Sequence, residues 1–134
     1  MKIWGIGANL GGSVDISNDF VNRKIAYLGY KKEDAPVFYE MLKEISLRDV
    51  VYIKSLPIGG SNLHIKNVGI VTRELSGVVQ YIDGDTKNDT LGVKWLDLQM
   101  DLDIEKCDKK YTARSTSIYR EYSPFVINEI MTRI

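Results

Sequence analysis

Aromatic residues and a polar, glycine-rich loop alternate within the first thirty residues. Trp4 stands in a short apolar segment, 2–6, and Tyr27 and Tyr30 flank a leucine and a glycine further on. The loop between them offers hydrogen-bond donors and acceptors from Asn9, Ser13, Asp15, Ser17 and Asn18. Aromatic faces hold flat ligands by stacking, and polar side chains read their edges. We expect this stretch to form one wall of a pocket for a flat ligand.

Each aromatic candidate also has a structural interpretation. Trp4 is either a stacking platform or a core residue of the first strand. Of Tyr27 and Tyr30, one is expected to pack and the other to meet ligand. Trp95, in a segment with alternating apolar residues, is either a further pocket residue or part of the sheet wall. The polar loop residues are also ordinary turn formers.

A basic run near the C-terminus is the second candidate surface. Its cations are Lys106, Lys109, Lys110, Arg114 and Arg120, and three tyrosines are interleaved with them. Such a run could follow a nucleic-acid backbone. The alternative is a solvated loop, because neighbouring acids neutralise part of its charge. The whole chain has 18 basic and 18 acidic residues, which argues against a protein that coats nucleic acid through bulk charge.

The early glycines do not make a nucleotide-binding fingerprint. They stand at Gly5, Gly7, Gly11 and Gly12, a spacing that differs from the dinucleotide and phosphate-loop patterns, and no Lys-Ser/Thr pair follows. We therefore interpret them as turn residues. Their backbone N–H groups could still meet an anion or a base edge.

Catalytic and metal-binding patterns are weak. His64 is the single histidine and Cys107 the single cysteine, so no Cys-x-x-Cys metal site or disulfide is expected. The acids at 101, 103 and 105 alternate with apolar residues, as in a strand edge protected by charge. We predict no metal, no cofactor and no enzymatic activity. A small hydrolase or an RNA-modifying enzyme is the least favoured alternative.

The elements that must position these residues are short strands and two main helices. One helix is expected at 34–48, capped by Asp34 with Pro36 in its first turn, and the other starts at Ser123-Pro124. The apolar stripe of the first consists of Phe38, Met41, Leu42 and Ile45. That of the second consists of Ile127, Ile130, Met131 and Ile134. A helical turn capped by Ser17 or Asn18 is expected at 17–24.

Strands are expected at 2–6, 49–54, 63–72, 78–82, 91–98 and 115–120, with a bulge near 67–69 and a polar turn at 83–89. Residues 1–134 fit one domain. We predict an α+β fold: a small curved mixed β-sheet or partly open β-barrel, with two main helices packed on it. Long strand–helix alternation is missing, which argues against a doubly wound sheet. Without a membrane span or signal segment, we expect a cytoplasmic protein that does not enter a membrane.

The order of these features resembles a known superfamily. A tryptophan in the first strand, a polar loop ending in Asp-Phe, and an aromatic-Gly-aromatic step precede the first main helix. The segments LRDVVYIK and LHIKNVGIVT follow it, and VKWLDL and SIYREYSPFVINEIM complete the layout. This pattern, over most of the chain, resembles the PUA-like superfamily, and within it the EVE and YTH-like branch. The branch includes N-terminal recognition domains of modification-dependent restriction enzymes.

The resemblance implies a single PUA-like domain with a pocket between its first loop and the neighbouring strands. In relatives such a pocket holds a modified base, often flipped from a nucleic acid and stacked on aromatic rings. The matching positions here are Trp4, the loop 9–19 and the segment 27–30. Where the family usually has a second tryptophan, this chain has Ala26-Tyr27. The expected ligand is a base in nucleic acid or, as an alternative, a free nucleotide that the protein sequesters in host–phage conflict.

Overall fold

The fold was analysed in a computed structural model that describes residues 1–10, 14–55, 62–75, 79–83, 86–106, 109–111, 114 and 116–134. Three α-helices are described: α1 (Ser17–Arg23), α2 (Pro36–Glu44) and α3 (Pro124–Met131). The strands are β1 (Ile3–Gly7), β2 (Asn9–Leu10), β3 (Val14–Asp15), β4 (Ile25–Ala26), β5 (Val50–Ser55), β6 (Asn62–Arg73), β7 (Val79–Asp83), β8 (Thr86–Asp89), β9 (Leu91–Trp95), β10 (Met100–Asp103) and β11 (Ile118–Arg120). Two short 3₁₀ turns span Ile104–Lys106 and Lys109–Tyr111.

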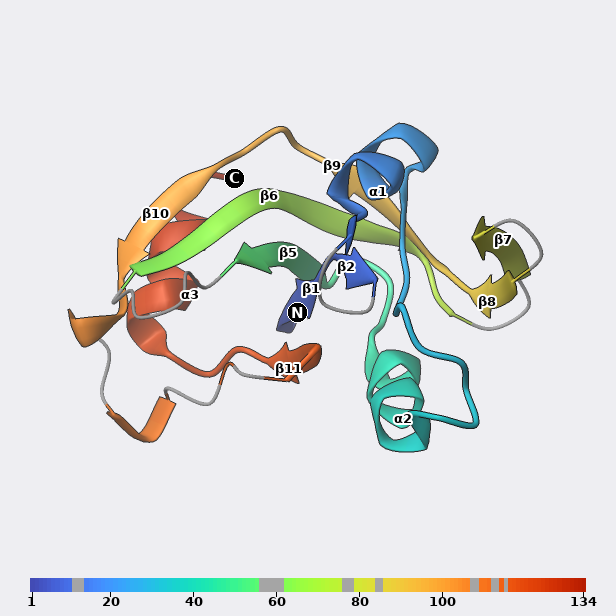
Figure 1. The fold of residues 1–134 in the computed structure, drawn as a ribbon. Coiled ribbons are helices and arrows are strands. Elements are labelled where there is room, and N and C mark those ends of the chain that lie inside the picture. Colours follow the sequence, from blue (N-terminus) through green and yellow to red (C-terminus); the bar gives the residue numbers. More distant parts are fainter. Residues whose placement is uncertain are drawn as a thin grey trace.

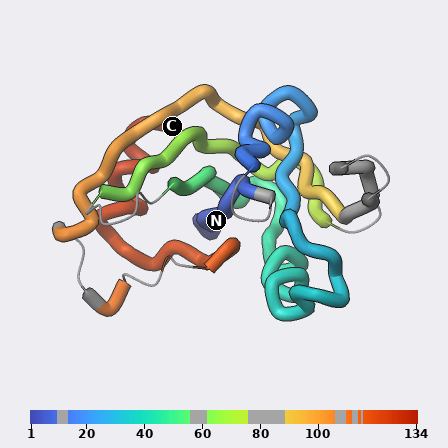
Figure 2. Tube along the Cα trace, viewed as in Figure 1, coloured from blue at the N-terminus to red at the C-terminus, as the bar shows by residue number. Residues whose placement is uncertain are grey.

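The longest strand, β6, is the middle of a curled seven-stranded sheet. The strand order is β11-β1-β5-β6-β9-β4, and β10 pairs with the first half of β6 on the same side as β9. The pair β1–β5 is parallel and the other pairs are antiparallel, so the sheet is mixed. The late segment containing β11, coloured orange to red, returns to the blue start of the chain (Figure 2). The predicted α+β class with a small curved mixed sheet is confirmed.

Helices cover both faces of this sheet. On one face, residues of α1, α2 and β4 pack with Trp4, Val51 and Val93. On the other, Val126 and Ile130 of α3 pack with residues of β5, β6, β10 and β11. Figure 1 shows α3 within the curve of β10, β6 and β5, while α1 and α2 lie toward the other end of the sheet. None of the helices in the described ranges is long and apolar enough to cross a membrane.

Helix α2 is shorter than the predicted 34–48. Its N-cap is Ala35 rather than Asp34, with Pro36 in the first turn as expected, and the backbone is already extended at Ile45. The helix ends there because the chain must turn into β5, and Arg48 takes a left-handed φ of 70° within that turn. Tyr39, absent from the predicted stripe, is buried beside Leu42, whereas Phe38 and Met41 are only partly buried.

Helix α1 forms where one turn was predicted, but neither Ser17 nor Asn18 caps it. The N-cap residue is Ile16, and the Asp15 carboxylate accepts hydrogen bonds from the N–H (2.8 Å) and hydroxyl (2.6 Å) of Ser17. Helix α3 begins at Pro124 as predicted, and the Ser123 hydroxyl accepts the Val126 N–H. Ile134, the last residue of the predicted stripe, lies beyond this helix and is exposed.

Strand boundaries depart from the predictions where tertiary pairing decides them. Residues 86–89, predicted as part of a turn, form β8 against β7. Strand β9 ends at Trp95 rather than 98, and β11 covers three residues of the predicted 115–120. The bulge expected near 67–69 lies one residue earlier: Ile53 and Lys54 pair with Asn67 and Ile65, so Lys66 is the extra residue. Asp101 and Asp103 lie on β10, which pairs along β6.

Asp49 ties the N-terminal strand to the loop before β5. Its carboxylate accepts hydrogen bonds from Lys2 N (3.0 Å), Trp4 Nε1 (3.1 Å) and Ser46 N (3.0 Å), and the residue is buried. Burial opposes ionisation, but these hydrogen bonds lower the pKa of the Asp49 carboxyl below its usual value. The indole of Trp4 is 1% exposed and belongs to the core. Of its two interpretations, the core residue is correct.

Replacing Asp49 with Ala should lower the free energy of unfolding by roughly 2–4 kcal/mol, because three N–H groups lose their acceptor. Urea denaturation measures this, with the exposed Asp34→Ala as control. Because the folded-state pKa is lowered, this stabilisation is present above about pH 4 and is lost as pH falls through the folded value. Asp49→Asn should therefore lose less stability than the parent between neutral and acid pH. Equal acid sensitivity of the two proteins would contradict this role.

Candidate functional site

A small cleft opens where four separate parts of the chain meet. They are the end of β1 together with the start of β2, the segment after β4, the end of β5 and the residues before β11. The cleft has a volume of about 190 Å³ and is lined by Gly7, Asn9, Leu28, Gly29, Tyr30, Lys54 and Ser117. Two residues predicted to bind ligand, Asn9 and Tyr30, therefore lie in one cleft.

Tyr30 presents its ring at this cleft while its backbone is held in place. The residue is 45% exposed, and its carbonyl accepts a hydrogen bond of 2.6 Å from the Tyr39 hydroxyl. The ring lies 6.1 Å from that of Phe38, tilted by 48°, and the Ser117 hydroxyl is 3.4 Å from the Tyr30 hydroxyl. An anchored aromatic side chain loses little conformational entropy when a flat ligand stacks on it.

Lys54 places a cationic group at the inner side of the cleft. Its ammonium donates to the carbonyl oxygens of Arg114 (2.5 Å) and Thr116, and it lies 5.0 Å from the centre of the Tyr119 ring. Burial lowers the pKa of the Lys54 amine to about 8. At neutral pH the side chain is thus mainly charged, and it connects β5 to the segment that leads into β11.

Lys54 should titrate with a pKa near 8, well below exposed lysines of the same chain. NMR of the lysine side-chain carbons against pH measures this, and Lys54→Met identifies the signal. Because the folded-state pKa is depressed, the unfolded chain binds more protons between about pH 8 and 10.5, so stability should rise with pH across that window. A Lys54 signal that titrates together with the exposed lysines would contradict the assignment.

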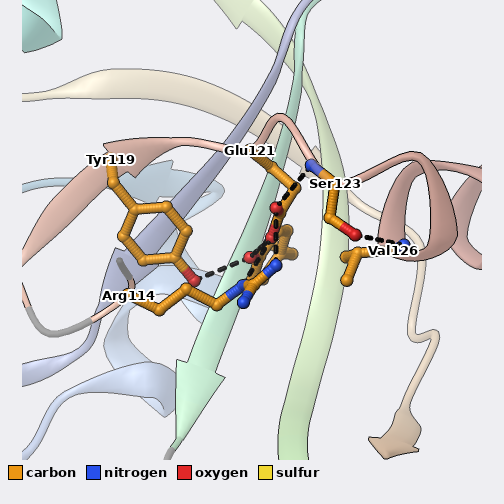
Figure 3. A network of polar contacts seen from close by, with 6 residues as sticks. Arg114, Tyr119, Glu121, Ser123 and Val126 are labelled. Carbon is orange, nitrogen blue, oxygen red and sulfur yellow. Dashed lines mark hydrogen bonds and ion pairs between the residues drawn. The ribbon is translucent and has the colours of Figure 1, made fainter. Parts of the chain in front are cut away.

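A buried ion pair fixes the segment that forms one wall of the cleft. Arg114 and Glu121 are 1% and 3% exposed, and the guanidinium meets the carboxylate at two points, 2.9 Å from Nε to Oε1 and 2.8 Å from Nη2 to Oε2. The same carboxylate accepts from the Tyr52 hydroxyl (2.6 Å) and from Ser123 N (3.1 Å). Figure 3 shows this network between β11 and the start of α3.

Tyr119 joins the network across the face of β1. Its hydroxyl is 2.6 Å from that of Tyr52, and burial raises the pKa of both phenols. Its ring lies against Gly5, where a Cβ would come within 2.4 Å of the ring. The glycine thus allows the close approach of β11 side chains to β1. Lys54 and Gly7 hold segment 114–117 through its carbonyls, and the ion pair with Glu121 holds the side chain of Arg114.

Glu121→Ala should destabilise the protein by about 3–5 kcal/mol, because it leaves Arg114 buried without its counter-charge. Removing both charges by Arg114→Met with Glu121→Leu should cost less than the single change. Chemical denaturation of the three proteins gives the comparison, with the exposed Glu40→Ala as control. If the double variant is less stable than Glu121→Ala, this account of the ion pair fails.

Three predicted pocket aromatics lie away from the cleft lining. Trp4 is in the core, and Tyr27 is 1% exposed with its hydroxyl donating to Asp19 Oδ2 (2.5 Å). Trp95 is half-buried, and its Nε1 donates to the carbonyls of Phe20 and Ile25, both at 3.1 Å. Trp4 and Tyr27 therefore do not line the cleft beside Tyr30. They support the elements on which Asn9 and Tyr30 stand.

The remaining predicted residues are divided between other surfaces. Asn18 is exposed on α1 and lines a different groove, described below. Ser13 lies outside the described residues, as do the side chains of Lys106 and Lys109. Arg114, predicted to contact a nucleic-acid backbone, is buried in its ion pair with Glu121, so its guanidinium does not reach the surface.

Lys110 and Arg120 do come together, in a second hollow near the end of β11. This hollow has a volume of about 320 Å³, and its lining includes Trp4, Met41 and Glu44 as well as both cations. Lys110 Nζ lies 5.2 Å from the centre of the Tyr111 ring, and the Arg120 guanidinium lies 4.8 Å from that of Tyr122. Two cations of the basic run thus lie over tyrosine rings of the same part of the chain.

Lys54 and Ser117 were not predicted from the sequence. Lys54 ends an apolar strand, where a lysine is an ordinary exposed residue, and Ser117 precedes a short strand in a run of Ser and Thr. The parallel pairing of β1 with β5 places Lys54 opposite Gly7, and Gly7 N donates to Ser117 O (2.8 Å). The sequence could have indicated Lys54 or Ser117 as a cleft residue only if this long-range pairing had been known.

Comparison with known proteins does not assign the chain to a family. No model of a protein family matches it, and no curated protein is significantly similar in sequence.

Proposed function

We propose that the protein is a non-catalytic binding module that holds a base, ordinary or modified, in the cleft beside Tyr30. The observation that carries this proposal is the convergence of an exposed, anchored aromatic ring with the Asn9 amide and the Lys54 ammonium in one cleft. Stacking on Tyr30 provides affinity, and the polar groups offer contacts to the edge of the base or to its phosphate.

The size of the cleft favours a small flat ligand. Its volume of about 190 Å³ is below the ~300–1,000 Å³ of pockets that enclose drug-sized molecules. A single base fits this scale better than a dinucleotide. The proposal also draws on the resemblance of the sequence to PUA-like domains of the EVE and YTH-like branch, whose pockets hold modified bases.

We further propose that the base belongs to a nucleic acid whose backbone crosses the hollow of Lys110 and Arg120. Both surfaces lie along one segment: Ser117 lines the cleft, and Arg120 lines the hollow. Three residues of extended chain separate them by ~10 Å. A nucleic-acid strand with one base stacked on Tyr30 can therefore place the neighbouring phosphates over Lys110 and Arg120.

A free nucleotide is the second candidate ligand. It is favoured by the net charge of zero, which provides little long-range attraction for a polymer. In this alternative a cytoplasmic protein sequesters a nucleotide messenger during host–phage conflict, and Lys54 meets the phosphate.

Tyr30→Ala should weaken binding of the base about 5- to 150-fold, the equivalent of ~1–3 kcal/mol of stacking. Tyr30→Phe should retain most of the affinity because the ring remains. Fluorescence anisotropy with single-stranded DNA and RNA, each with and without N6-methyladenine or 5-methylcytosine, measures both variants. Full affinity of Tyr30→Ala would exclude the cleft as the site.

Lys110→Ala and Arg120→Ala distinguish the two ligand classes. If the ligand is a polymer, each should weaken oligonucleotide binding modestly and reduce its salt dependence between about 50 and 200 mM salt, while nucleoside binding is unchanged. A flat salt slope, together with thermal stabilisation by free nucleotides, would favour the free-nucleotide alternative.

A further inference from the structure

A larger groove lies beside α1, and none of its described lining residues belongs to the cleft. Its volume is about 630 Å³, and it is bounded by α1, by the bulged part of β6 and by the segment from Asp97 to Asp101. The bulge at Lys66 shapes one wall, because four consecutive residues, 64–67, contribute to the lining.

Asn67 gives this groove a fixed hydrogen-bond donor. The residue is 6% exposed, and its Oδ1 accepts from Val68 N (2.9 Å) and Leu98 N (3.2 Å). Because backbone N–H groups can only donate, the oxygen must face them, and the Nδ2 group is the polar part left for the groove. This Nδ2 forms no hydrogen bond to another described residue, so it is available as a donor to a ligand in the groove.

Acceptors stand on the other wall. His64 Nδ1 lies 2.9 Å from Asp101 Oδ1, and a ring that carries its single N–H on Nδ1 has Nε2 as an acceptor. The side chains of Asn18, Asn22 and Gln99 can both donate and accept. The described part of the lining has one lysine, Lys66, which is paired with Asp15 at 2.9 Å, against two aspartates, Asp97 and Asp101. Phosphorylated ligands are therefore disfavoured.

Apolar side chains complete the groove. Ile53, Ile65 and Met100 line it and are at most 7% exposed. No Trp, Tyr or Phe is among the described lining residues, so a stacking platform for a base is missing from this part of the groove. A sugar ring matches this combination, because its hydroxyls both accept and donate hydrogen bonds while its C–H groups pack on apolar surface.

We propose that this groove is a second binding site, for an uncharged polyhydroxylated ligand the size of one or two sugar rings. A hydroxyl oxygen of the ligand accepts from Asn67 Nδ2, and neighbouring hydroxyls donate to His64 Nε2 or the Asp97 carboxylate. The site is independent of the cleft beside Tyr30.

Titration of the ¹⁵N-labelled full chain with D-ribose, D-glucose and D-galactose tests this proposal. At least one sugar should give saturable NMR shifts of the Asn67 side-chain amide and of the backbone at 64–67 and 97–101, and glucose 6-phosphate should bind more weakly than glucose. Absence of saturable shifts with all three sugars, or tighter binding of the phosphate, would overturn it.

Two variants examine the contacts. Asn67→Asp keeps an oxygen for the N–H groups of Val68 and Leu98 but removes the donor, and should lower sugar affinity about fivefold or more. Asn18 is exposed and lines the groove, so Asn18→Ala should also weaken sugar binding. This variant tests the site even if Asn67→Asp does not fold. Asn128→Ala, on the exposed face of α3, is the matched control and should bind normally. Unchanged affinity in Asn18→Ala and in folded Asn67→Asp would contradict the site.

Discussion

The buried ion pair between Arg114 and Glu121 fixes the C-terminal part of the chain against the central sheet. Its carboxylate also holds the Tyr52 hydroxyl of β5 and the N–H of Ser123, the residue that caps α3. One side chain thereby links the central sheet, the edge strand β11 and the C-terminal helix (Figure 3). Removing one partner of a pair this deeply buried leaves the other charge uncompensated, which ties the position of the segment to the integrity of the core.

Both proposed nucleic-acid surfaces depend on that segment. The carbonyls of Arg114 and Thr116 hold the Lys54 ammonium, Ser117 lines the cleft, and Arg120 reaches the second hollow. The opposite wall is supported separately, because Tyr39 of α2 anchors the backbone of Tyr30. A cleft whose walls are anchored before binding loses less entropy when ligand arrives. The described walls of the groove beside α1 include the bulged part of β6 and no residue from 114–121, so the groove depends little on that segment.

Local patterns predicted the class of fold and part of the cleft. Alternating apolar residues and turn signals indicated a curved sheet, and the Gly-Tyr step with the preceding polar loop pointed to Tyr30 and Asn9. Burial was harder to predict: Trp4 and Tyr30 are both aromatic residues near glycines, yet Asp49 draws the Trp4 indole into the core. Arg114 belonged to a basic run by sequence, and only the fold brings Glu121 to it. Lys54 and Ser117 line the cleft because distant strands such as β1 and β5 pair, and no local sequence pattern predicts that pairing.

The central claim is that a base lies against the ring of Tyr30 in the cleft. The most direct measurement is the set of intermolecular NOEs between the ring protons of Tyr30 and a bound modified nucleoside or short oligonucleotide. The account predicts NOEs from the base protons to Tyr30, together with shifts at Gly7, Asn9 and Ser117 that line the same cleft. A bound ligand whose base protons show NOEs elsewhere on the protein and none to Tyr30 would contradict it.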